Sequence, residues 1–104
     1  MAQLRRGVLE YCVLALLAEQ ERYGYDLVVA LSDAGLVASQ GSLYPLLSRL
    51  RRDALVETTW RESTDGPPRR YYRLTAAGAS QLDAFRPAWA DFSAHVNRIL
   101  KGTS

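Results

Sequence analysis

Arginine residues in the middle of the chain carry the clearest chemical signal in this sequence of 104 residues. Residues 41–73 contain seven Arg and four Asp or Glu, a net charge of +3, whereas residues 1–40 carry −2 and residues 74–104 carry +1. Arginine presents a planar fork of donors that suits bidentate contact with phosphates and base edges. Charge alone is more typical of a solvated surface, so a nucleic acid becomes the favoured partner only if these arginines lie on a DNA-binding framework.

Catalytic and metal-binding chemistry are not expected. His95 is the only histidine and Cys12 the only cysteine, so the sequence has neither a ligand cluster nor a nucleophile–base pair. It also has no Gly-rich phosphate loop and no carboxylate pair at catalytic spacing. We therefore expect a protein that is not an enzyme and binds no cofactor or metal, with Cys12 packed as a small apolar side chain.

Two short helices are predicted to position the arginines. The first spans about residues 24–34, because Gly35 is a typical residue just beyond a helix end. The second begins at about residue 41 or 42, because Pro45 fits only near a helix start. Its apolar stripe is Leu43, Leu46, Leu47 and Leu50, and its opposite face is Ser42, Tyr44, Pro45, Ser48, Arg49 and Arg52. This arrangement predicts a helix-turn-helix whose outward face contacts DNA.

A two-stranded hairpin is predicted directly after these helices. Residues 55–62 are rich in strand formers, residues 63–68 are turn formers, and residues 69–74 resemble a returning strand that begins with Arg69 and Arg70. A hairpin in this position is a wing, and its two arginines would reach DNA. We expect Trp60 to anchor the hairpin in the core, and one of Tyr71 and Tyr72 to point inward.

The two ends of the chain predict a dimer. Residues 4–18 are apolar on nearly all sides, which is typical of a helix that is covered on all sides. Thr75 can cap a last helix, which Pro87 should kink or split. Apolar residues at spacings of 3 and 4 form a seam along that last helix. The predicted interface consists of Leu9 with the seam residues Leu82, Phe85, Trp89, Phe92, Val96 and Ile99.

The resulting expectation is a mainly α protein with a small β-hairpin. Residues 1–75 would form a winged helix-turn-helix DNA-binding domain and residues 76–104 a C-terminal dimerisation helix, together one compact unit. The apolar run from Val8 to Ala18 is too short to span a membrane. Because Glu10 interrupts this run, it is also unlike the apolar region of a secretory signal peptide. We expect a cytoplasmic protein without a membrane partner.

Trp89 permits two interpretations. It can simply pack in the core of the dimer, or it can line an apolar cavity at the dimer centre together with Phe92 and Val96. In the second case a flat aromatic effector would stack there.

The sequence resembles the PadR family of winged helix-turn-helix transcriptional regulators, in its short form with a single C-terminal helix. The most specific matches are Gly-Ser-Leu-Tyr-Pro at residues 41–45 and Tyr-Tyr-Arg-Leu-Thr at residues 71–75. Further matches are Leu-Arg-Arg-Gly at residues 4–7, Tyr-Gly-Tyr at residues 23–25, Leu-Val-Glu at residues 55–57, and Gly78. Tyr23 departs from the His that family members often have at the start of the second helix, and Gln40 replaces a frequent Pro.

The resemblance implies a homodimer that binds a pseudo-palindromic operator on double-stranded DNA. It further implies a repressor that is released by a small phenolic or planar hydrophobic effector. Ser42, Tyr44 and Arg49 would then touch phosphates and base edges in the major groove, and the wing arginines would reach adjacent phosphates or the minor groove. Tyr23, at the start of the second helix, is also expected to contact DNA.

An alternative is a winged-helix module that contacts only other proteins and binds no DNA. Such a module would tend to lack the basic wing and the basic helix face present here. Retention on heparin that weakens with salt would distinguish the two functions.

Overall fold

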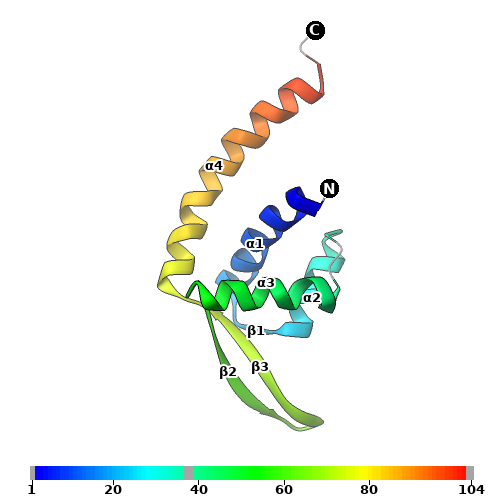
Figure 1. Cartoon of the computed structure of the whole chain (residues 1–104), viewed down its shortest axis with the longest axis vertical. Coiled ribbons are helices and arrows are strands. Elements are labelled where there is room, and N and C mark those ends of the chain that lie inside the picture. Colours follow the sequence, from blue (N-terminus) through cyan, green and yellow to red (C-terminus); the bar gives the residue numbers. More distant parts are fainter. Residues whose placement is uncertain (1, 37–38, 103–104) are drawn as a thin grey trace.

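The computed structural model describes residues 2–36 and 39–102 and contains four helices and three strands within them (Figure 1). Residues 37 and 38, between the two predicted short helices, therefore lie outside the described residues, as do the two outer ends of the predicted domains. In chain order the elements are α1 (Ala2–Glu19), β1 (Arg22–Tyr23), α2 (Gly24–Asp33), α3 (Gln40–Arg52), β2 (Val56–Ser63), β3 (Gly66–Leu74) and α4 (Ala76–Leu100). This architecture confirms the prediction of a mainly α fold with a small β element.

Leucine side chains of α1, α2 and α3 form most of the core. All four residues of the predicted α3 stripe, from Leu43 to Leu50, are buried, and Leu27 of α2 and Val13 of α1 have no exposed surface. Leu55, Val56 and Tyr72 extend this core under the sheet. The core therefore fixes one face of α3 and leaves its opposite face free for other contacts.

The predicted hairpin is present as β2 and β3, and a short strand that the sequence did not predict, β1, joins it in a three-stranded antiparallel sheet. The strand order is β1-β3-β2, with Arg22 and Tyr23 of β1 opposite Tyr72 and Tyr71 of β3. A strand of two residues has no periodicity to detect, which explains the omission. The turn is also shorter than predicted, because β3 already begins at Gly66 and includes two prolines. Those prolines lie where β3 has no neighbour other than β2, a position that strand prolines tolerate.

Side-chain caps define the starts of α3 and α4. Ser39 accepts a hydrogen bond from the backbone N–H of Ser42, and the Ser42 hydroxyl accepts one from the N–H of Ser39. This reciprocal capping box starts α3 at Gln40, slightly earlier than predicted. Thr75 caps α4 as predicted and accepts a hydrogen bond from Gly78 N–H at 3.0 Å.

Helix α4 is a single helix that leaves the body of the protein. It runs through Pro87 with a gradual bend and is not split, and its second half projects beyond α1 (Figure 1). The longest dimension is therefore 59 Å, and the radius of gyration is 15.5 Å, against about 13 Å for a compact chain of this length. Across the described ranges 2–36 and 39–102, no helix has the length and apolar character that crossing a membrane would require.

Candidate nucleic-acid interface

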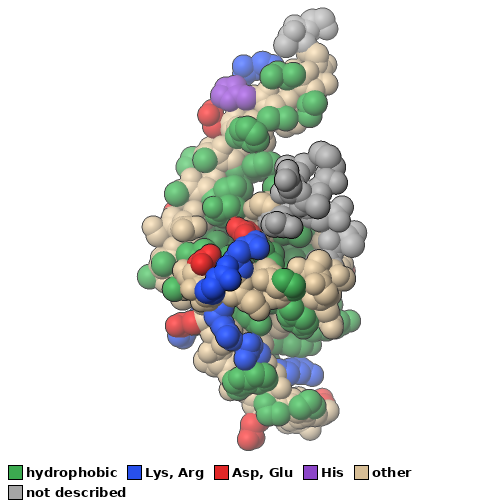
Figure 2. Space-filling view, viewed as in Figure 1, with side chains coloured by type: hydrophobic (Ala, Val, Ile, Leu, Met, Phe, Trp, Pro, Cys, Tyr) green, Lys and Arg blue, Asp and Glu red, His purple; other side chains and the backbone are tan. Residues whose placement is uncertain are grey.

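The outward face of α3 carries most of the side chains that the sequence predicts for DNA contact. Ser42, Tyr44, Pro45 and Ser48 are exposed, and the Arg52 side chain is 73% exposed. Arg52 Nε lies 3.9 Å from Asp53 Oδ1, and this weak surface pairing leaves the guanidinium available for contact with an external group. Figure 2 shows basic side chains running from α3 toward the wing, and in this part of the sequence they are all Arg.

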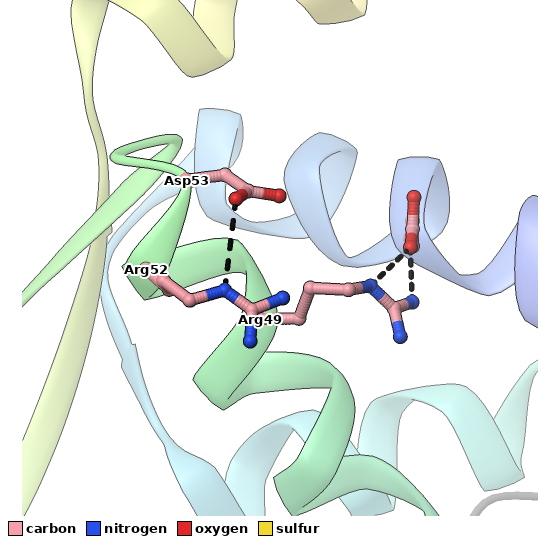
Figure 3. Close-up of polar contacts among 4 residues, drawn as sticks. Arg49, Arg52 and Asp53 are labelled. Atoms are coloured by element: carbon pink, nitrogen blue, oxygen red, sulfur yellow. Dashed lines mark hydrogen bonds and ion pairs between the residues drawn. The ribbon is translucent and has the colours of Figure 1, made fainter.

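Arg49 lies differently from the other predicted contact residues. Its guanidinium reaches back to α1 and pairs with the Glu10 carboxylate, with a distance of 3.0 Å between Arg49 Nε and Glu10 Oε1 (Figure 3). Both side chains are only about a third exposed, at 32% and 28%. In this structure the Arg49 side chain therefore joins α3 to α1, a contact that sequence spacing could not predict because 39 residues separate the partners.

The wing arginines divide into paired and unpaired groups. Arg61 pairs with Glu21, and Arg73 pairs with Glu57. Among the ion pairs of the described residues, neither Arg69 nor Arg70 takes part. Their positive charges are therefore available to an external anion.

Aromatic rings support the two unpaired guanidinium groups. Arg69 lies over the Tyr23 ring at 4.6 Å, and Arg70 lies over the Trp60 ring at 4.8 Å. Such stacking orients a guanidinium without neutralising it. Tyr23 is itself half-buried and packs against Tyr71, so the structure gives it the position of a support for Arg69.

A groove of about 530 Å³ separates the wing from the starts of α2 and α3, and we call it the wing groove. Arg69, Arg70, Ser48 and Gly24 contribute to its lining. Its aromatic lining consists of Tyr23, Tyr25, Tyr44, Trp60 and Tyr72. A Cβ atom at Gly24 would lie 2.7 Å from Cε1 of Tyr44, so this glycine lets the Tyr44 ring lie against α2. Residues of the α3 face and of the wing therefore line the same groove.

The prediction that Trp60 anchors the wing in the core was wrong. Its indole is 62% exposed and lines the wing groove. Tyr72 is the buried tyrosine of the neighbouring strand, whereas Tyr71 is half-buried on the other face. Trp60 lies opposite Arg70 in the register, nearer the tip than Tyr72, where the wing already extends beyond the helices.

Metal-binding and redox chemistry have no structural support in the described part of the chain. No group of three potential metal ligands occurs there. Burial raises the pKa of the Cys12 thiol, which disfavours the reactive thiolate.

The residues predicted for a dimer interface fall into two groups. Leu9 and Leu82 are buried in the core of the single chain, and Phe85 stacks on Tyr11 of α1 with 3.8 Å between ring centroids. These three side chains therefore have little surface left for a partner. Trp89, Phe92 and Ile99 are 39%, 61% and 75% exposed, and Val96 is half-buried.

Comparison with known proteins identifies the family. The model of the PadR-like transcriptional regulator family matches residues 13–84, which include α2, α3 and the complete wing. The chain belongs to the PadR-like family. It is therefore a transcriptional regulator, and members of this family bind DNA.

Characterised and solved PadR-like proteins match nearly the whole chain. The transcriptional regulator Rv3488 of Mycobacterium tuberculosis is 35% identical over 96 residues, which cover 92% of this chain and 89% of that protein. A PadR-like transcriptional regulator from Bacillus cereus is 42% identical, with a TM-score of 0.86, and 96% of this chain and 98% of that chain are covered. A PadR-like transcription factor from Bacteroides fragilis is 44% identical, with a TM-score of 0.82 and coverage of 94% and 95%. These matches confirm the resemblance and the winged-helix fold.

Proposed function

We propose that this PadR-like protein acts as a homodimer that binds a pseudo-palindromic operator on duplex DNA. The observation that carries the proposal is the continuous surface formed by the α3 face and the unpaired wing arginines. Helix α3 enters the major groove with Ser42, Tyr44 and Ser48 toward phosphates and base edges, and Pro45 adds apolar contact. Arg52 lies one turn beyond Ser48 on the same face of α3 and contacts the DNA backbone.

The wing contacts the adjacent phosphates or minor groove in this proposal. Arg69 and Arg70 carry the contact, because their guanidinium groups are oriented by aromatic rings and have no carboxylate partner among the described residues. Tyr23 acts by holding Arg69. Arg49 contributes mainly by fixing α3 on α1, although its free donors remain near the α3 face.

A second copy of the chain is the proposed partner of α4. Trp89, Phe92 and Ile99 form an exposed apolar stripe on the half of α4 that leaves the body of the protein (Figure 2). Their spacing of 3 and 7 residues follows a heptad seam, which pairs well with an identical helix. Twofold symmetry would place the two α3 helices about 34 Å apart, one turn of DNA.

The centre of that dimer is the proposed effector pocket. Trp89 and Phe92 lie 6.4 Å apart between ring centroids, and Val96 is one turn further along α4. Two copies would place two indoles at one apolar site, which suits a flat aromatic molecule. Because release by such a molecule is the mode of action that the resemblance implies, we propose that the protein is a repressor.

Selection of bound sequences from random duplex DNA tests the proposal directly. We expect two related half-sites whose centres are about one helical turn, roughly 10 base pairs, apart. Sedimentation of the free protein should give the mass of two chains at micromolar concentration. A monomer that leaves every duplex unbound at low salt would contradict the proposal and favour a module that contacts proteins alone.

A further inference from the structure

The wing groove has the size and lining of a ligand site. Its volume of about 530 Å³ lies within the range of roughly 300–1,000 Å³ that is usual for small-molecule sites. None of its lining residues lies on α4, which carries Trp89 and Phe92, so the wing groove shares no residue with the proposed effector pocket.

Aromatic faces are unusually available in the wing groove. Trp60 keeps 62% of its surface exposed, although the Arg70 guanidinium lies over its ring. Tyr25 and Tyr44, on the other side of the groove, are also exposed. Exposed aromatic rings beside guanidinium groups are the combination on which unpaired bases stack in single-strand binding proteins.

Arg70 forms the polar end of the wing groove. The Nε atom of Arg70 is shielded from solvent and has no hydrogen-bond partner, and no Asp or Glu lines the groove. A buried donor without an acceptor is unfavourable, so a ligand oxygen placed there would relieve it. Ser48 of α3 also lines the groove, and its hydroxyl can donate a further hydrogen bond.

We propose that the wing groove binds one unpaired nucleotide, with its base on the aromatic rings of Trp60 and Tyr44 and its phosphate on Arg70. A duplex cannot use the groove in this way, because its bases are stacked on their neighbours and do not offer a free face. The ligand is either a free nucleoside monophosphate or a nucleotide within a single strand. The inference concerns the protein without duplex DNA and does not depend on the proposed operator contact.

Fluorescence of Trp60 reports directly on nucleotide binding in the wing groove. The chain has two tryptophans, so the Trp89→Phe variant leaves Trp60 as the sole indole. Addition of dTMP should quench its emission in a saturable manner, whereas thymidine and inorganic phosphate should each bind at least about tenfold more weakly, because each supplies one half of the contact. The Trp60→Phe variant, which reports from Trp89, should show no saturable change.

Two arginine variants from the same strand complete the test. Arg70→Gln should weaken dTMP binding by about tenfold or more, since it removes a charge-assisted contact. Arg73→Gln should leave binding within about twofold, because Arg73 pairs with Glu57 outside the groove. Equal binding of phosphate and dTMP, or equal effects of the two variants, would overturn the proposal in favour of a plain anion contact.

A dT decamer compared with dTMP identifies the source of the nucleotide. Binding of the decamer that is at least about tenfold tighter supports a single strand as the ligand, and equal binding per site supports the free nucleotide. Duplex binding is measured with the same proteins. Failure of duplex binding with intact Trp60 quenching contradicts only the operator proposal, and absence of quenching with intact duplex binding overturns only this inference.

Discussion

Among the arginines of this protein, identical side chains have different roles because their partners differ. Arg49 and Arg73 are held by carboxylates, whereas Arg69 and Arg70 stack on aromatic rings and keep their charge available. Charge counting along the sequence treats all of them alike. The structure separates them into those that hold elements together and those that can meet phosphate.

Arg69→Ala should weaken duplex binding without unfolding the protein. Loss of one phosphate contact per subunit should reduce the slope of log K against log salt by about 1 per subunit. The melting temperature should stay within about one degree, because Arg69 is exposed. Gel-shift titrations at several salt concentrations measure the slope. Arg73→Ala, on the same strand, is the control, and an equal loss in both variants would contradict a specific role for Arg69.

Glu10 and Arg49 should contribute measurably to stability. Each single variant, Glu10→Gln or Arg49→Gln, should lower the free energy of unfolding by about 1–2 kcal/mol, because a largely buried charge loses its partner. A double-mutant cycle by urea denaturation isolates the coupling between them. The exposed Glu57–Arg73 pair serves for comparison and should couple by at most about 0.5 kcal/mol. A coupling energy for Glu10–Arg49 as small as that for Glu57–Arg73 would show that Arg49 is not held by Glu10 in solution.

At the scale of elements, close approach of backbone segments fixes where α4 begins. A Cβ atom at Gly78 would lie 2.1 Å from the Leu55 carbonyl oxygen and 2.6 Å from Cδ1 of Leu74. The first turn of α4 therefore rests on the chain that leads into β2. The Thr75 hydroxyl, which donates to the Ala54 carbonyl at 2.7 Å, reinforces the same junction.

Gly78→Ala should be strongly destabilising, although alanine is the better helix former. The contact with backbone cannot relax by a side-chain rotation, so we expect a loss of about 2–3 kcal/mol or more, measured by thermal and urea unfolding. Gly7→Ala in α1 is the matched control. Among the described residues, no atom outside its own helix backbone and chain neighbours lies within 4 Å of its added Cβ, so that variant should be neutral or up to about 1 kcal/mol more stable. Similar effects of the two substitutions would disprove the tight junction.

The elements that the sequence predicts correctly are those with a periodic apolar stripe over several turns or with a specific capping residue. The leucine stripe of α3 and the cap at Thr75 are local signals, and both are confirmed. Strand β1 was missed because it exists only by pairing with β3, about fifty residues later. Trp60 was misplaced because strand alternation does not reveal where a strand leaves the core. The Glu10–Arg49 pair depends on how α1 crosses α3, which no local pattern encodes.

At the scale of the whole molecule, the chain buries one core and exposes a second apolar surface on α4. Phe85 of α4 stacks on Tyr11 of α1, and Trp89 follows Phe85 at 5.9 Å between ring centroids. Further along α4, Phe92 and Ile99 keep 61% and 75% of their surface exposed. An exposed stripe of this kind on a projecting helix is typical of an association surface.

Phe92→Asp combined with Ile99→Asp should separate the proposed dimer. Sedimentation should show the mass of one chain, and operator affinity should fall by at least about tenfold because the half-sites lose their linkage. Circular dichroism should retain the helical signal, since both side chains lie outside the core. Ala90→Asp places a charge on the opposite side of α4 and should leave the dimer intact. A double variant that stays dimeric would show that α4 does not carry the interface.

The proline within α4 has a consequence for the proposed dimer, which would bind two half-sites at once. Pro87 cannot donate the backbone hydrogen bond that would tie it to the preceding turn, and it lies between the anchored half of α4 and the free half. The free half from Ala88 to Leu100 is about 20 Å long, so a ten-degree change at this pivot would move its end by about 3 Å. That displacement is close to the rise of one base pair, about 3.4 Å. A dimer joined through the C-terminal halves of α4 would therefore tolerate operators whose half-site spacing differs by about one base pair.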